Sequence, residues 1–269
     1  MRTTFSALIR HLFRFKVFYI AGAVLALAIY VLTHLSIPKS VQPEPTGDQY
    51  SYEHFIAANN VSLHVVKTVP GAVHLRIVDD NVTRTGIVGV NGGFFWEKQL
   101  LSIAVENDQP AGGTKGQRGS GWFNAKYARG TLVYDGDTGL FSVQVVSDAD
   151  QIKVQDRSRY WAQGGISLNL RDDVRWRAQA ETEAIPVPDE FRLRSAMAYD
   201  GKGQVYLFVT DVRCTAEDYR KAILEYGNAE AHRLIDGIFL DGDGSSQLST
   251  REAMLSGDGR AVLQMIGVD

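Results

Sequence analysis

Short apolar segments alternate with glycine-containing turns through most of the chain after residue 60, and this alternation limits the fold more than any other feature. The segments are four to seven residues long, which is typical of strands and too short for most helices. Steps such as Asn91-Gly92, Asp135-Gly136 and Asp241-Gly242 separate them, and such steps favour turns because Asn, Asp and Gly tolerate positive φ. The segments expected as strands are residues 62–67, 73–78, 86–90, 101–105, 131–134, 140–146, 204–210 and 237–240.

Local patterns also predict one hairpin and one helix. The Asp200-Gly201 step, which lies between two apolar segments, predicts a β-hairpin. Thr215 is suited to begin a helix, since Asp218 follows three residues later as in a capping box, and Gly227 is suited to end it. Between them, helical spacing relates the apolar residues Tyr219, Ala222, Ile223 and Tyr226. These patterns predict a strand-rich α+β domain with a mostly antiparallel mixed sheet and a few helices.

An uncharged apolar run of 21 residues, 17–37, lies near the N-terminus. At 1.5 Å per residue, a helix of this length crosses a hydrocarbon core of about 30 Å. Arg10, Arg14 and Lys16 precede the run, and Lys39 follows it. This excess of basic residues on the N-terminal side predicts that the N-terminus stays in the cytoplasm. One N-terminal transmembrane helix is therefore expected before the globular domain.

The chain divides into a basic cytoplasmic tail (1–16), a transmembrane anchor (17–37), a proline-rich linker (38–50) and a globular domain (51–269). This arrangement predicts a single-pass protein of the cell inner membrane, held in the lipid bilayer, with a periplasmic domain. A cleaved signal peptide is the alternative, with its cleavage site at Ala26-Leu27-Ala28. Against that alternative, residues 29–32 continue the apolar run behind the site.

The net charge of −3 conceals an uneven distribution. Residues 1–38 hold four basic and no acidic residues, which leaves 24 basic and 31 acidic residues in the rest of the chain, a net charge of −7. A domain this acidic is a poor general nucleic-acid binder, because phosphate contacts need clustered positive charge. Cys214 is the single cysteine, so an intramolecular disulfide and a cysteine-based zinc site are both excluded. The six histidines are scattered and predict no metal site.

The most informative segment is IDGIFLDGDGSSQL, residues 235–248, where an apolar strand runs into carboxylates, glycines and hydroxyls. Its DxDGS pattern is that of the aspartate-nucleophile phosphatases, but their chemistry needs a later lysine, and none of the 28 residues after Asp241 is a lysine. A calcium loop is a second interpretation, in which positions 1, 3, 5 and 12 of the EF-hand pattern are Asp241, Asp243, Ser245 and Glu252. Ser246 stands where that loop needs glycine, and a strand enters the loop instead of a helix.

Four motifs, taken in order, carry a third interpretation. Residues 89–95 read GVNGGFF, residues 161–165 read WAQGG, residues 194–196 read RSA and residues 241–246 read DGDGSS. Together they resemble the phosphodiester glycosidase family, which includes the uncovering enzyme and bacterial homologues associated with exopolysaccharides. The resemblance spans about residues 60–250. Two positions depart from the family pattern, since Asp243 replaces a glycine and Ile166 replaces a proline.

The resemblance implies a hydrolase that cleaves the glycosidic C–O bond of sugar-1-phosphodiesters, in envelope or exopolysaccharide metabolism, and that requires no cofactor. A carboxylate near C1 would stabilise an oxocarbenium-like transition state, and Asp241 is the candidate. Arg194 would bind the phosphate through its planar fork. The Asn91 amide would bind sugar hydroxyls. Further substrate-binding residues would be Gly92, Gly93, Phe94, Gln163, Gly164, Ser195, Gly244, Ser245 and Ser246.

Several alternatives stay open at this point. A non-catalytic glycan-binding or assembly protein on the same fold would fit if the extra charge of Asp243 prevents catalysis. Metal-dependent phosphoester cleavage, with Ca²⁺ as the possible cation, would release a sugar-1-phosphate instead of a free sugar. Glu97 and Asp211 are reserve candidates for a second carboxylate. The glycine-rich segment 111–121, which contains Lys115 and Arg118, fits either a lid over an anionic substrate or a flexible surface loop.

Overall fold

The computed structural model describes residues 49–229 and 233–269. The predicted cytoplasmic tail, transmembrane anchor and nearly all of the predicted linker lie outside the described residues. Among the residues that are described, no helix is both long enough and apolar enough to cross a membrane.

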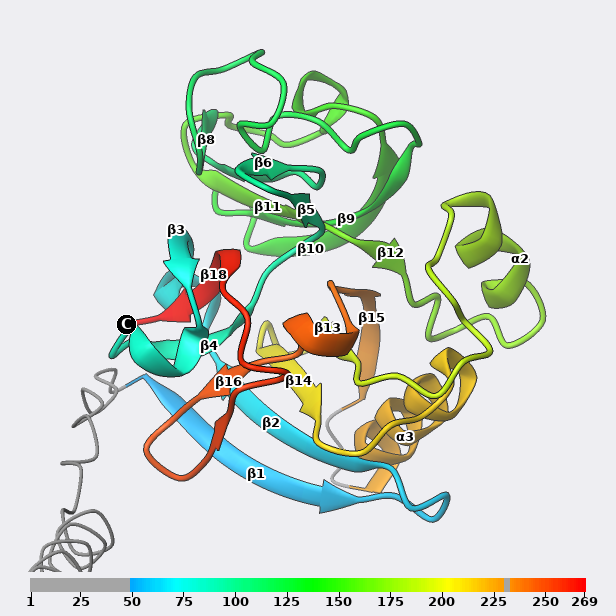
Figure 1. The fold of residues 1–269 in the computed structure, drawn as a ribbon. Helices are drawn as coiled ribbons and strands as arrows, with labels where there is room; N and C mark the ends of the chain where they lie inside the picture. Colours follow the sequence, from blue (N-terminus) through cyan, green and yellow to red (C-terminus); the bar gives the residue numbers. More distant parts are fainter. Residues whose placement is uncertain (1–48, 230–232) are drawn as a thin grey trace, which may run out of the picture. The chain divides into compact units, whose positions relative to one another are not determined.

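The largest sheet has six strands, and every neighbouring pair in it is antiparallel (Figure 1). In spatial order its strands are β1 (Tyr50–Ile56), β2 (Ser62–Thr68), β14 (Val205–Thr210), β13 (Ser195–Asp200), β15 (Leu234–Phe239) and β12 (Ile166–Ser167). The helices α2 (Trp176–Thr182) and α3 (Ala216–Ala229) pack on one face of this sheet. There the Tyr226 ring of α3 meets Tyr206 and Phe208 of β14 edge-on, at centroid distances of 6.1 and 5.5 Å.

Two five-stranded antiparallel sheets complete the framework. One has the order β10 (Leu140–Val146), β9 (Arg129–Asp135), β11 (Tyr160–Gly164), β7 (Ala104–Glu106) and β8 (Gln109–Pro110). The other has the order β17 (Met254–Leu255), β16 (Leu248–Ser249), β4 (Val88–Asn91), β18 (Val262–Val268) and β3 (Val73–Asp80). A two-stranded hairpin joins β5 (Phe95–Trp96) to β6 (Gln99–Leu100), and the 3₁₀ helices are η1 (Pro70–Ala72), η2 (Val82–Arg84), η3 (Ala149–Gln151) and η4 (Asp243–Ser245).

One buried core joins the three sheets. Side chains from the second face of the six-stranded sheet, such as Val66 and Leu207, pack in one cluster with Val90 of β4, Ile266 of β18 and Leu132 of β9. The ends of strands from different sheets therefore meet across a shared core, and loops that follow those strands are brought together.

The strand-rich α+β prediction is confirmed, with antiparallel pairing throughout the named strands of the described residues. The predicted hairpin is confirmed as β13 and β14, whose registers pair Tyr199 with Val205. The predicted single sheet is wrong, because the strands divide among three sheets and a small hairpin. Residues 101–103, which were expected in a strand, lie between β6 and β7 instead.

The predicted helix corresponds to α3, and its capping box is present. The Thr215 hydroxyl accepts a hydrogen bond from the Asp218 amide at 3.1 Å and donates to the Asp218 carboxylate at 2.7 Å. The predicted end at Gly227 is wrong, because α3 continues to Ala229. Gly227 serves close packing, since a Cβ at this position would lie 3.1 Å from the side chain of Leu234 in β15.

Candidate active site

The side chain of Asn91, at the end of β4, connects three of the four sequence motifs. Its amide nitrogen donates to the backbone oxygens of Asp241, at 2.8 Å, and Gly92, at 3.2 Å. Its amide oxygen accepts from the Ser195 hydroxyl, at 2.8 Å, and from the backbone N–H of Gln247, at 3.1 Å. The three strand ends are thus held around one buried amide. Every hydrogen-bonding position of this amide is used inside the protein, so Asn91 holds the backbone of Asp241, and its predicted binding of sugar hydroxyls stays a prediction.

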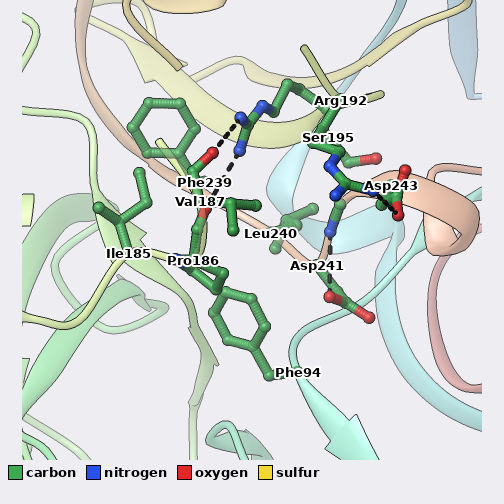
Figure 2. A pocket seen from close by; sticks show the side chains of 12 residues that line it. Phe94, Ile185, Pro186, Val187, Arg192, Ser195, Phe239, Leu240, Asp241 and Asp243 are labelled. Carbon is green, nitrogen blue, oxygen red and sulfur yellow. Dashed lines mark hydrogen bonds and ion pairs between the residues drawn. The ribbon is translucent and has the colours of Figure 1, made fainter. Parts of the chain in front are cut away.

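A pocket with a volume of about 90 Å³ opens where these strand ends meet (Figure 2). Four of the predicted site residues line it, namely Phe94, Arg194, Ser195 and Asp241. The other lining residues are Ile185, Pro186, Val187, Arg192, Phe239, Leu240, Gly242 and Asp243. In Figure 2 the Phe94 ring and the Asp241 carboxylate reach into the same space.

Asp241 is the partly buried carboxylate of this pocket. Burial raises its pKa to about 6, against the opposing effects of the Ser245 hydroxyl, the Gly242 amide and the charge of Arg260. The Gly242 N–H donates to one carboxylate oxygen at 3.0 Å. A carboxyl with this pKa is mostly ionised at pH 7 and is basic enough to exchange a proton or to attack an electrophile at that pH.

Asp243 stands in η4, where its φ of 53° lies in the left-handed region. Glycine adopts this conformation without steric cost and Asp adopts it at a small cost. The left-handed backbone therefore explains why the motif that this loop resembles has glycine at this position. The Asp243 carboxylate, 39% exposed, accepts from Arg192 at 2.9 Å and from Arg213 at 3.2 Å. The additional negative charge beside Asp241 is therefore offset by two guanidinium groups.

The Arg194 guanidinium is buried and bonded to main-chain carbonyls. It donates to the carbonyls of Val187 and Glu190, at 2.9 Å each, and makes longer contacts with those of Cys214 and Pro186, at 3.4 and 3.5 Å. Within the described residues no carboxylate pairs with Arg194. Most of its donors hold the loop 186–190 that forms the pocket wall, and its predicted role as a phosphate ligand stays a prediction.

Arg192 is the arginine that sequence reasoning missed. It lines the pocket, its side chain is 35% exposed, and it pairs with Glu190 at 2.5 Å as well as with Asp243. The sequence did contain a signal. In Arg192-Leu193-Arg194 the two arginines are two residues apart, which is the spacing that places side chains on the same face of a strand. Ile185, Pro186 and Val187 were also missed, and no local pattern marks them.

The remaining predicted residues support the pocket from behind or lie outside it. A Cβ on Gly92 would lie 2.0 Å from Gln264, and one on Gly93 would lie 2.5 Å from Ser102, so these glycines allow close packing. The structure does not bring Gln163 and Gly164 to the pocket. The Gln163 side chain is fully buried in β11 and accepts from the Gln264 amide at 2.6 Å.

The DGDGSS loop contributes through its backbone and through one hydroxyl. Gly244 lies so close to Asp258 that an added Cβ would approach its carboxylate to 2.2 Å. Ser245 hydrogen-bonds the Asp241 carboxylate. Ser246 is buried and does not line the pocket.

The described residues give no support for a calcium site at this pocket, and the reserve carboxylates Glu97 and Asp211 do not line it. The described residues hold no group of three or more His, Cys, Asp and Glu side chains that could bind a metal ion. Glu252, the expected twelfth ligand, accepts a hydrogen bond from the Tyr50 hydroxyl at 2.9 Å. Asp211 pairs with His64 at 3.3 Å, and Glu97 is exposed between β5 and β6.

No protein-family model matches the chain, and no curated protein matches its sequence. Among solved structures, the fold is similar to the catalytic domain of zebrafish N-acetylglucosamine-1-phosphodiester alpha-N-acetylglucosaminidase, auto-inhibited by its pro-peptide. That match has a TM-score of 0.53 and 16% identity, and it covers 85% of this chain and 84% of the zebrafish chain. The comparison shows that the two proteins share a fold.

Two further solved structures are more distant. A hypothetical protein from Synechocystis has 14% identity and a TM-score of 0.46, with 81% of this chain and 61% of that one covered. A putative exported protein from Burkholderia pseudomallei has 12% identity and a TM-score of 0.34, with coverages of 82% and 58%.

Proposed function

We propose that the protein is a hydrolase that cleaves the glycosidic C–O bond of sugar-1-phosphodiesters. The observation that carries the proposal is Asp241, a partly buried carboxylate with a pKa of about 6 in a pocket that also contains an aromatic ring and an exposed arginine. The shared fold adds support, because the name of the zebrafish enzyme describes action on an N-acetylglucosamine-1-phosphodiester. Fold alone does not define chemistry, so the argument depends on the pocket.

The chemistry requires a carboxylate close to C1 and a stabilised leaving group. Cleavage leaves the bonding electron pair on the phosphate oxygen and positive charge on C1, which the ionised Asp241 stabilises. The phosphate monoester departs as an anion, so it needs less help from a general acid than an alkoxide does. Water supplies the hydroxyl that completes the hemiacetal, and its proton passes to a base. Asp241 serves either as that base or as a nucleophile that first binds C1 covalently.

Arg192 is the cation best placed to hold the phosphate. Its guanidinium lines the pocket and retains an exposed face, whereas Arg194 gives most of its donors to the carbonyls of loop 186–190. Phe94 would offer an apolar face for the sugar ring, opposite the polar DGDGSS loop. In this assignment Asn91, Ser195 and Ser245 hold Asp241 in position, and none of the three touches the substrate.

The proposal also includes a location. The uncharged run 17–37 with its basic flank would anchor the chain in an inner membrane, with the hydrolase on the periplasmic side. There the substrates would be sugar-phosphate glycans of the envelope or exopolysaccharide. The glycan-binding alternative loses its main support, because Arg192 and Arg213 offset the charge of Asp243 that was expected to prevent catalysis.

The test is turnover of the full-length chain in detergent on a sugar-1-phosphodiester, with free sugar as the measured product. Asp241→Asn keeps the shape of the side chain and removes its charge, so kcat should fall about a hundredfold or more. Glu252→Gln is the matched control, since it changes a carboxylate of the same region outside the pocket. A fully active Asp241→Asn variant, or a wild-type chain that releases no sugar from any such diester, would remove the basis of the proposal.

A further inference from the structure

A second pocket, larger than the first, lies among the segments 99–101, 118–119 and 123–127. Its volume is about 480 Å³. Its lining residues are Gln99, Leu100, Leu101, Arg118, Gly119, Phe123, Asn124, Ala125, Lys126, Tyr127 and Ser147. This set contains two basic and no acidic side chains, although the residues after the predicted anchor are acidic overall.

The two basic residues of the second pocket, Arg118 and Lys126, differ in their ion pairing from most other basic residues on the surface. Arg84, Arg159 and Arg175, for example, each pair with a carboxylate. Within the described residues neither Arg118 nor Lys126 forms an ion pair. Two cations without carboxylate partners beside one cavity create a positive potential there, which favours an anionic ligand.

Backbone hydrogen bonds make the two pockets neighbours. Phe94, which lines the Asp241 pocket, accepts a hydrogen bond from the Leu101 amide at 2.8 Å. Leu101 in turn accepts one from the Ala125 amide at 2.8 Å, and both of these residues line the second pocket. Backbone hydrogen bonds therefore connect the chain segment at Phe94, in the wall of the first pocket, to the segments at Leu101 and Ala125, in the wall of the second.

Arg129 contacts one aromatic ring of each pocket, although it lines neither. The residue is about nine-tenths buried. Its guanidinium lies 5.0 Å from the ring centroid of Phe94 in the first pocket and 5.6 Å from the ring centroid of Tyr127 in the second. Its Nε donates to the Glu183 carbonyl at 3.0 Å, two residues before Ile185 of the first pocket. Its terminal amino groups form no hydrogen bond within the described residues.

We infer that the second pocket is a cationic subsite for the part of the substrate beyond the scissile phosphate, with Arg118 and Lys126 along it. The inference rests on the proposed function, because Asp241 then fixes C1 in the first pocket. Asp241 and Arg192 keep C1 and the scissile phosphate at the first pocket, and the rest of the leaving group is assigned to the neighbouring second pocket. The chemical class assigned to that group is an anionic glycan that carries further phosphates or carboxylates.

The kinetic test compares two substrates with the same sugar, one a methyl phosphodiester and the other a diester of an oligosaccharide that carries several phosphates. Arg118→Ala/Lys126→Ala should raise KM for the extended substrate about tenfold more than for the methyl diester, with kcat for both within twofold. Lys153→Ala/Lys202→Ala is the matched control, since both lysines are exposed and line neither pocket. The control should leave the ratio of the two KM values unchanged. Equal changes for the two substrates, or no change for either, would overturn the subsite.

A binding measurement separates failure of the subsite from failure of the proposed function. The probe is inorganic tripolyphosphate, titrated calorimetrically into the full-length chain in detergent. Binding that weakens about tenfold in Arg118→Ala/Lys126→Ala and not in the lysine control supports the subsite, even if no phosphodiester is hydrolysed. Equal binding by all three proteins contradicts the subsite, even if the hydrolase activity is present.

Discussion

At the scale of single residues, the candidate chemistry depends on how one carboxylate is held. Asn91 binds the backbone of Asp241, the Gly242 amide binds its carboxylate, and Ser245 binds the carboxylate through a hydroxyl. These donors favour the ionised form, yet burial outweighs them and leaves the pKa at about 6. A fixed and poorly solvated carboxylate of this kind can respond strongly to positive charge that develops on C1.

The pKa of Asp241 predicts the pH dependence of activity. Since the ionised form stabilises C1, kcat/KM should rise with pH through about 6 and then level off. The measurement is kcat/KM for a methyl phosphodiester of the sugar between pH 4 and 8, where the substrate phosphodiester does not change charge. A profile that falls as pH rises through 6 would mean that the protonated form is active.

The same pKa predicts a change in stability with a definite sign. The folded pKa of about 6 exceeds the ordinary aspartate value of 3.8, so between these pH values the folded state holds a proton that the unfolded state has lost. Stability from this group is therefore lost as pH rises from about 4 to 6, and Asp241→Asn avoids that loss. Urea denaturation should show the variant more stable than wild type by about 1–3 kcal/mol at pH 7 and nearly equal to it at pH 4. A larger difference at pH 4 than at pH 7 would contradict the assignment.

Asp243→Gly tests whether the departure from the family pattern affects binding. Glycine removes the left-handed strain of an L-residue, worth about 1 kcal/mol, and the lost ion pairs are exposed and worth about as much. The free energy of unfolding should therefore change by less than about 1 kcal/mol. Arg192 loses one of its carboxylate partners, so KM for a phosphodiester should fall while kcat stays similar. A large fall in kcat would instead give Asp243 a direct part in the reaction.

At the scale of elements, the pocket wall is a loop held by one arginine. Arg194, which immediately precedes β13, donates to carbonyls of residues 186–190 and also contacts the Cys214 carbonyl just before α3. A buried guanidinium satisfies several carbonyls at once in a way that no other side chain can. The position of Ile185, Pro186 and Val187 at the pocket therefore depends on Arg194.

Arg194→Lys should loosen this wall. A lysine offers one ammonium group where the guanidinium reaches several separated carbonyls, so we expect a loss of about 1–3 kcal/mol in stability, with kcat and KM both impaired. The measurements are Tm and hydrogen exchange of the amides in 185–190. An unchanged Tm with a raised KM alone would restore Arg194 as a direct phosphate ligand.

The elements that could be predicted are those that local sequence defines. The hairpin at Asp200-Gly201 and the start of α3 at Thr215 follow from turn and capping chemistry within a few residues. The division into three sheets could not be predicted, because it depends on pairings between distant segments, such as β18 with β3. The same limit applies to the site. Asp241 and Phe94 lie in recognisable motifs, whereas Ile185 reaches the first pocket only through contacts with distant residues.

The errors at the site share one physical cause. Glycine and amide side chains occur both where a ligand approaches and where two chain segments pack closely, and the sequence does not distinguish the two. Gln163 and Gly164 were expected to bind substrate, but they fill a buried contact with Gln264, Asn124 and Ile103. Asn91 is similar, since its hydrogen bonds are all made within the protein.

At the scale of the whole molecule, charge and topology suit a hydrolase of anionic glycans. The residues after the predicted anchor are acidic overall, yet Arg118 and Lys126 line the second pocket and Arg129 contacts the rings of Phe94 and Tyr127. A local positive region on an acidic protein attracts an anionic group to one place and repels it elsewhere. The predicted anchor would hold this surface near envelope glycans.

Membrane fractionation tests the predicted anchor. The uncharged run 17–37 should retain the full-length chain in the membrane fraction after alkaline carbonate extraction, whereas a fragment that begins at Val41 should be soluble. N-terminal sequencing of the membrane-bound chain should find the natural start. A mature chain that is free in solution, or one that starts after Ala28, would show a cleaved signal peptide instead.

The most direct test of the central claim is hydrolysis of a sugar-1-phosphodiester in ¹⁸O-labelled water, with both products weighed by mass spectrometry. Cleavage of the C–O bond places the label on C1 of the released sugar and leaves the phosphate monoester unlabelled, and this is the result we predict with Asp241 as the essential carboxylate. Label on phosphate, together with release of a sugar-1-phosphate, would mean that the P–O bond breaks and would contradict the account.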